Sequence, residues 1–486
     1  MRARGVGQNR GAPGKREAVR LGAAAGYAVE LMTMNRLNFI KAGCRMLLLW
    51  GCLAALGVRA QQPSAPASDV HFTFVPLTNE ANAVIAEPVK SDPVRSHIAI
   101  LIAHPEHINT FNYFMAPELA RRGFRTMMMN YYGREQRYEE FLAPLALAIQ
   151  YLRSQPGIDK VILAGHSSGG AELTFYQDVA ENGPKACRGS DRIYPCDGDH
   201  FEHLPKADGV MLLDINIGGP LRAIGIDPAV DNDHPTVRKR ELDMFDPRNG
   251  YDAKTHSGHY GAEFERKFFL AQQARNQRLL TETMARLALI NRGEGKFKDD
   301  EPFTVGGGST RINGARLDLA DRSLLSRTHA VHVLLKADGT APTEIVPSLL
   351  GGAANDGDLG KLYDTAQMGT VRHYLSFYAF HTTPAFKTTA DGIQGIDWRS
   401  SANSAVGNVE GITVPTLVMA GTCAAHIVPN ELAYDHSHAQ DKEFTAVEGA
   451  DHFFRACKPQ YGDTVKRTFD HVDGWLARAG RFDGAH

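Results

Sequence analysis

The sequence carries little net charge, few cysteines and no apolar run long enough to span a membrane. Its 486 residues include 53 basic and 55 acidic side chains, a formal net charge of −2. This balance indicates neither a nucleic-acid-binding surface nor a polybasic membrane patch. No phosphate-binding loop, dinucleotide-binding fingerprint or internal repeat is present in the sequence. The 43% hydrophobic and 22% charged residues are typical of a folded globular protein.

Metal-binding spacings are lacking too. Histidine and aspartate cluster at residues 197–200, 256–259 and 436–438. None of these clusters has the spacing of a zinc site or an EF-hand, so we interpret them as solvated loop residues. We therefore expect no metal and no cofactor.

The longest apolar run lies near the N-terminus and has the pattern of a secretory signal. Basic residues precede the apolar residues 46–58, and residues 58–60 give a small-x-small cleavage site. A run of this length is too short for a permanent membrane span. We expect residues 1–60 to be an N-terminal extension and signal peptide, the signal covering about Met34 to Ala60, and the mature protein to be periplasmic or secreted.

A signal that begins so far into the chain favours a translation start at Met32 or Met34. A lipoprotein anchored through Cys52 is the alternative, although Trp50 fits that motif poorly. Residues 61–69 are rich in proline, alanine and serine, which predicts a flexible linker.

Removal of the signal leaves four of the six cysteines, an even number. In an oxidising compartment these predict two disulfides. Cys187 with Cys196 would close a short polar loop, and Cys423 with Cys457 would then form the second pair. Four unpaired thiols are the alternative.

Strand-like and helix-like segments alternate over much of the chain. Apolar, β-branched runs predict strands at 70–75, 83–89, 98–103, 126–131, 161–164, 209–214, 416–421 and 444–447. Helical spacing predicts helices at 115–122, 138–153, 171–176 and 465–476. This alternation predicts an α/β fold with a mostly parallel central sheet and helices on both faces.

The alternation stops between residues 215 and 411. A long helix is predicted at 260–290 and a hairpin around 332–336, and an aromatic run lies at 374–378. We interpret 215–411 as a large, mainly helical cap (lid) insertion between two parts of the core, 70–214 and 412–486. An ordinary second domain unrelated to the site is the alternative.

The candidate nucleophile lies in residues 165–170, with the sequence GHSSGG, directly after an apolar strand. A strand that ends in G-x-S-x-G and leads into a helix is typical of a nucleophile elbow. Two serines compete for the role. Ser167 is favoured over Ser168 because it has glycine two residues before and two residues after it.

A serine hydroxyl needs a base to take its proton. The best candidate among the 20 histidines is His452, in the loop between the last predicted strand and the final helix. With residues 165–170, 415–421 and 449–454, the chain resembles the α/β-hydrolase superfamily of serine esterases and lipases from residue 70 to the C-terminus, apart from the cap. The resemblance implies Ser167 as nucleophile and His452 as general base.

The third member of the triad departs from that pattern. Many relatives carry an aspartate in a run resembling G-x-x-D-x-x-V-P, but residues 421–429 have alanines in the acid's position. The acid is then Asp214 at the end of the preceding strand, or Glu431 just beyond the usual position, or it is missing. Asp214 preserves the chain order serine, acid, histidine.

An oxyanion needs two backbone N–H donors. Ser168, which follows the nucleophile, is one. Relatives usually have His-Gly after the strand at 98–103, but this chain has His104-Pro105 there. Pro105 has no N–H, so Glu106 is expected to donate, with Asn109 as a spare side-chain donor.

Together these features predict a secreted or periplasmic serine hydrolase that cleaves a small-molecule carboxylic ester through an acyl-enzyme. The same residues also suit a lactonase, a peptidase or an acyltransferase. A binding protein with a decayed triad stays open because of the missing acid. The oligomeric state and the physiological substrate are not indicated.

Overall fold

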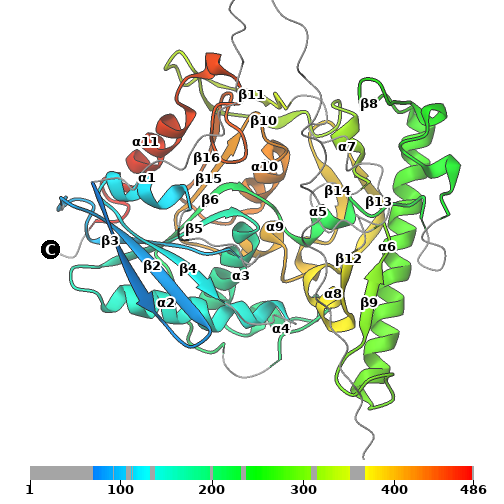
Figure 1. Cartoon of the computed structure of the whole chain (residues 1–486), viewed down its shortest axis with the longest axis horizontal. Helices are drawn as coiled ribbons and strands as arrows, with labels where there is room; N and C mark the ends of the chain where they lie inside the picture. Colours follow the sequence, from blue (N-terminus) through cyan, green and yellow to red (C-terminus); the bar gives the residue numbers. More distant parts are fainter. Residues whose placement is uncertain are drawn as a thin grey trace, which may run out of the picture. The chain divides into compact units, whose positions relative to one another are not determined.

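The largest sheet of the structure has ten strands (Figure 1). The computed structural model describes residues 69–90, 92–104, 111, 113–131, 137–197, 201–230, 237–307, 315–350 and 367–483. The predicted signal peptide and residues 61–68 of the predicted linker lie outside these ranges. No helix among the described residues combines the length and apolarity needed to cross a membrane.

The sheet is mostly parallel. In spatial order its strands are β1 (Val70–Pro76), β2 (Ala81–Pro88), β4 (Arg125–Tyr131), β3 (Ile98–Ile102), β5 (Lys160–Ser167), β6 (Gly209–Ile215), β15 (Thr416–Gly421), β16 (Lys442–Val447), β10 (Arg327–Leu335) and β11 (Thr343–Pro347). The pairs β1–β2, β2–β4 and β10–β11 are antiparallel, and all the other neighbours are parallel.

Helices cover both faces of this sheet. The helices α1 (Met115–Arg121) and α11 (Thr464–Leu476) pack on one face, and α2 (Leu142–Ser154), α3 (Gly169–Asn182) and α10 (Ile427–His436) pack on the other (Figure 1). Successive side chains of the buried strand β3 point to opposite faces of the sheet. Ile100 packs in the cluster that contains α1 and α11, and Leu101 packs in the cluster that contains α2, α3 and α10. The predicted α/β class, with a mostly parallel sheet between helices, is confirmed.

The boundaries predicted for the cap need a correction. The hairpin β10–β11 lies inside residues 215–411, yet β10 pairs in parallel with β16 and extends the central sheet. Leu334 and Val346 of this hairpin are buried in the main core. The sequence predicted a hairpin here, but the residues of a hairpin do not reveal which strand edge it will join.

The rest of residues 215–411 mixes helices with short strands. Its helices are α5 (Gly219–Ala223), the long α6 (Ala262–Asn291), α7 (Leu317–Ala320), α8 (Val371–Phe377) and α9 (Ala405–Asn408). Its two-stranded sheets are β7 (Tyr251–Asp252) with β8 (Ser257–Gly258), β9 (Pro302–Val305) with β12 (Gln367–Thr370), and β13 (Thr382–Thr388) with β14 (Ile393–Ile396). Two apolar clusters outside the main core hold this region together. That it covers the site stays a prediction.

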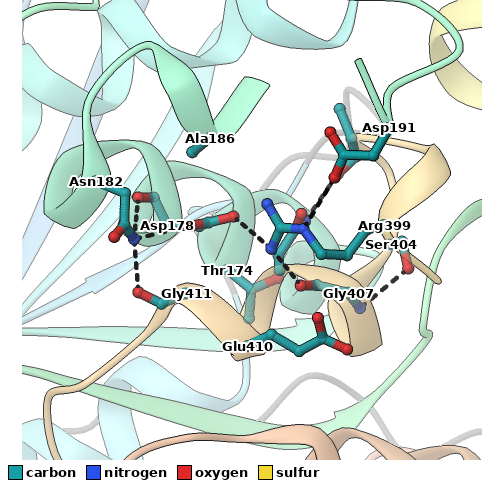
Figure 2. Close-up of polar contacts among 12 residues, drawn as sticks. Thr174, Asp178, Asn182, Ala186, Asp191, Arg399, Ser404, Gly407, Glu410 and Gly411 are labelled. Carbon is teal, nitrogen blue, oxygen red and sulfur yellow. Dashed lines mark hydrogen bonds and ion pairs between the residues drawn. The ribbon is translucent and has the colours of Figure 1, made fainter. Parts of the chain in front are cut away.

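The last part of this region fixes α3, the helix that follows the candidate nucleophile (Figure 2). Asn182 of α3 donates to the carbonyl of Gly411 at 2.7 Å. Asp178, also on α3, lies 3.5 Å from the guanidinium groups of both Arg399 and Arg192. Asp178 and Arg192 are almost fully buried, so these charges must be paired where they are. The polar cluster therefore ties α3 to residues outside the sheet.

A close backbone contact sets how α3 sits on the sheet, and this contact can be tested. A Cβ at Gly169 would lie 2.4 Å from the carbonyl oxygen of Ala103, which follows β3. We expect Gly169→Ala to destabilise the protein by about 1–3 kcal/mol, because backbone must move to admit the methyl group. Thermal unfolding would measure the loss.

The matched control is Gly474→Ala in α11, where an added Cβ meets nothing within 4 Å. Alanine is the better helix former, so this variant should be as stable as the wild type or more stable. Equal melting temperatures for the two variants would contradict the close contact at Gly169.

Candidate active site

Ser167 is the last residue of β5 and has the strained backbone of a nucleophile elbow. Its φ is +54°, a left-handed backbone conformation that residues other than glycine rarely adopt. Glycines make the turn possible: a Cβ at Gly165 would lie 2.7 Å from the Cα of Gly170, and one at Gly170 would lie 2.4 Å from the side chain of Ile215. The partly exposed serine thus stands at the N-terminus of α3.

The histidine predicted as the base contacts one of the two predicted acids. His452 lies in the loop between β16 and α11, and its Nδ1 is 2.6 Å from Oδ2 of Asp214. Asp214 lies near the end of β6, the strand next to β5, with a φ of +48°. Its side chain is fully buried, whereas that of His452 is 23% exposed. The partly exposed imidazole is therefore held from behind by a carboxylate that water does not reach.

Asp214 has two more donors. Nδ1 of His426 lies 3.0 Å from the same oxygen, Oδ2, and the backbone N–H of Gly421 donates to Oδ1 at 3.0 Å. Burial opposes the charge on Asp214, but His426 and His452 outweigh it, and the pKa of the carboxyl falls below its usual range. Burial also lowers the pKa of His426. The arrangement is that of an ionised acid with a neutral imidazole, His426, beside it.

Glu431, the alternative acid, lies elsewhere. It is buried on α10, where its carboxylate accepts from the backbone N–H groups of His329 and Ala330 on β10. It also lies 2.7 Å from Nε2 of His332. These contacts fasten α10 to β10, and the carboxylate that contacts His452 is that of Asp214 instead.

Of the two predicted oxyanion donors, the structure describes one. Ser168 occupies the N-cap of α3, so its backbone N–H stands at the positive end of that helix. Glu106, like Pro105 and Asn109, lies outside the described residues. The chain leading to it, at Ala103, runs directly against Gly169.

Both predicted cysteine pairs lie at disulfide distance. The Cα atoms of Cys187 and Cys196 are 5.5 Å apart, and those of Cys423 and Cys457 are 6.3 Å apart. Cys423 lies three residues before His426, and Cys457 five residues after His452. The second pair therefore joins the two loops whose imidazoles meet on Asp214.

Sequence reasoning assigned no role to His426 or His166. His426 lies in the run where relatives carry the acid, and that position was the available signal for it. His166 belongs to the elbow motif, but no pattern predicted its contacts with Tyr113 and the backbone of His452.

Among the residues that the structure describes, Asp214, His426 and His452 are the group arranged most like metal ligands, with ligand atoms within 4.8 Å of one another. Both imidazole nitrogens lie at hydrogen-bond distance from one carboxylate oxygen, so each must carry a hydrogen there. A metal ion would have to replace both hydrogens. The distances fit an acid hydrogen-bonded by two imidazoles better than a preformed metal site.

No family model matches the chain, and no curated protein matches its sequence. Among solved structures, it is similar to a hypothetical protein from Pseudomonas aeruginosa (TM-score 0.41, 13% identity, 86% of this chain and 96% of that chain). It is also similar to a monoglyceride lipase from Saccharomyces cerevisiae (TM-score 0.37, 12% identity, 86% of this chain and 96% of that chain). A third similar structure is brefeldin A esterase, a bacterial homologue of human hormone-sensitive lipase (TM-score 0.36, 13% identity, 85% of this chain and 78% of that chain). The strand order and the strained serine described above agree with the α/β-hydrolase fold that the sequence predicts.

The hydrogen bond between His426 and Asp214 should contribute to the stability of the fold. His426→Phe removes one donor from a buried carboxylate and should lower the free energy of unfolding by about 1.5–3 kcal/mol. His426→Asn keeps a side-chain N–H near the position of Nδ1 and should lose less. Denaturant unfolding at neutral pH compares the two, and equal losses would contradict a role for this hydrogen bond.

The pH dependence of that loss follows from the lowered pKa of Asp214. Because the pKa is lower in the folded state, the charged carboxyl stabilises the fold fully above its unfolded value of about 4. This contribution fades as the pH falls further. The stability gap between the wild type and His426→Phe should therefore narrow below about pH 6.5, because the unfolded wild type then takes up a proton at His426 more readily than the folded protein does, and it should narrow further below about pH 4.

The disulfides offer a matched pair of variants. Removing Cys423 and Cys457, which are 34 residues apart, should cost roughly 3–4 kcal/mol and also lower turnover, because the loops of His426 and His452 lose their link. Removing Cys187 and Cys196, only 9 apart, should cost less and leave turnover unchanged at temperatures where the protein is folded. Equal turnover in the two double variants would contradict this reading.

Proposed function

We propose that this protein is a serine hydrolase that cleaves carboxylic esters of small molecules. The observation that carries the proposal is the 2.6 Å contact between Nδ1 of His452 and Oδ2 of Asp214, close to a serine in the strained elbow conformation. Ring centroids of His452 and His166, the residue before Ser167, are 4.5 Å apart, so the base lies beside the elbow.

In the proposed mechanism, the hydroxyl of Ser167 attacks the acyl carbon while Nε2 of His452 takes its proton. Asp214 holds the imidazole with Nδ1 protonated, which leaves Nε2 free to act as the base, and it stabilises the imidazolium that forms. His452 then gives the proton to the leaving alcohol, and an acyl-enzyme results. Water, activated by His452, releases the acid and frees Ser167.

The negative charge on the attacked carbonyl oxygen needs preorganised donors. We assign one to the backbone N–H of Ser168, which the N-terminus of α3 supports. The second is assigned to the backbone of Glu106 on the sequence pattern alone. We place the enzyme in the periplasm or outside the cell, which the signal-like N-terminus and the two cysteine pairs support.

Fluorophosphonate labelling and ester hydrolysis test the triad. Ser167→Ala should abolish both, and Asp214→Asn should lower turnover by about 10⁴-fold, because the imidazole then adopts the wrong tautomer. Glu431→Gln is the control: it alters a buried carboxylate of the same neighbourhood that contacts β10, and the folded variant should keep its turnover.

Three outcomes would redirect the assignment. Labelling at Ser167 without ester hydrolysis would favour a lactonase, peptidase or acyltransferase that uses the same residues. No labelling of the folded wild type would contradict a reactive serine and favour a binding protein. Turnover lost in Glu431→Gln but kept in Asp214→Asn would overturn the assignment of the acid.

A further inference from the structure

His166, the residue between Gly165 and the candidate nucleophile, is buried and makes hydrogen bonds through both ring nitrogens. Only 1% of its surface is accessible to solvent. Nδ1 lies 2.5 Å from the hydroxyl of Tyr113, and Nε2 lies 2.6 Å from the backbone carbonyl oxygen of His452. Since Tyr113 precedes α1 and His452 follows β16, His166 joins three segments that are distant in the sequence.

These contacts allow one protonation state. A carbonyl oxygen only accepts, so Nε2 of His166 must carry the hydrogen. Burial, together with the nearby His452, lowers the pKa of His166 to about 3, so the ring is neutral at ordinary pH. Nδ1 therefore has a lone pair, which accepts from the hydroxyl of Tyr113. The hydroxyl of Tyr113 thus stabilises the tautomer that the carbonyl of His452 requires.

The backbone and the side chain of His452 are then held from two sides. Its imidazole contacts Asp214 at the end of β6, and its carbonyl accepts from His166 at the end of β5. The rings of His166 and His452 also lie against each other, 4.5 Å apart and tilted by 31°. Because His166 is bonded directly to Ser167, its side chain ties the base to the chain position of the nucleophile.

We propose that His166 is a positioning residue, which sets the place of His452 relative to Ser167 through its hydrogen bond to the His452 carbonyl, with Tyr113 hydrogen-bonded to its other ring nitrogen. This inference rests on the proposed function for its effect on turnover, but the hydrogen-bonded link itself does not. A shift of about 1 Å in a reacting group can lower turnover roughly 10²-fold, so such a link has a measurable effect.

Three substitutions of His166 distinguish its hydrogen bond to the His452 carbonyl from its hydrogen bond to Tyr113. His166→Gln places an amide N–H near the position of Nε2 and keeps the donor to the His452 carbonyl. His166→Asn keeps an acceptor near Nδ1 for Tyr113 but loses that donor, and His166→Phe loses both. We expect less than a tenfold loss of kcat for Gln and a loss of roughly 10²-fold for Asn and Phe, with KM little changed.

The control is His471→Gln on α11, a histidine with a hydrogen bond of the same length, 2.6 Å, to Glu443. It should keep the wild-type kcat. Tyr113→Phe removes the hydrogen bond at Nδ1 of His166, and its kcat should lie between those of the His166→Gln and His166→Phe variants. Full kcat in a folded His166→Phe protein, or equal kcat for Gln and Phe, would overturn the proposal.

A spectroscopic readout keeps this test separate from that of the proposed function. The proton between Nδ1 of His452 and Asp214 should give a low-field resonance in the proton NMR spectrum, identified by its loss in Asp214→Asn and its persistence in His426→Phe, which removes the other imidazole on this carboxylate. We expect it to be retained in His166→Gln and displaced or lost in His166→Phe. If the wild type hydrolyses no ester, the proposed function fails, but the resonance still tests whether His166 positions His452. An unchanged resonance in all three variants would overturn the positioning role.

Discussion

The carboxylate of Asp214 holds together segments that are far apart in the sequence. Its two oxygens accept from Gly421, His426 and His452, which are 207, 212 and 238 residues away. A buried charge without such donors would be strongly destabilising. Strands β6 and β15 and the loops that carry His426 and His452 must therefore be arranged so that these donors reach the carboxylate. The position of the imidazole of His452 is therefore a consequence of how a buried charge is satisfied.

The elbow depends on a second constraint, which is steric. Strand β5 and helix α3 meet at glycines whose missing side chains let backbone touch backbone, and the strain of Ser167 is held by that packing. On its other side α3 is fixed by the buried pairing of Asp178 with Arg192 and Arg399. Strain at one end of the helix is thus opposed by a polar anchor further along it.

Much of the fold could be predicted from the sequence, because strands such as β3 and β15 are short apolar runs buried on both faces. Ser167 and His452 were predictable because each belongs to a local motif. The contact of Asp214 with His452 could be named only as one alternative to a contact of Glu431, because it depends on which strand ends meet, and sequence spacing does not report that. His426 was hidden for the same reason. The docking of β10 on β16 was missed because β10 alternates buried and exposed residues, which predicts a hairpin but not its neighbour.

The hairpin β10–β11 also changes how the insertion can be divided. Because it returns to the sheet edge, and Glu431 fastens β10 to α10, residues 215–411 do not form one detachable module. They form two excursions, one before β10 and one after β11, which pair with each other through β9 and β12 and share an apolar cluster. A domain exchange would have to replace both excursions together and keep the hairpin between them, since cutting out the whole segment would remove two strands and leave the edge of β16 unpaired.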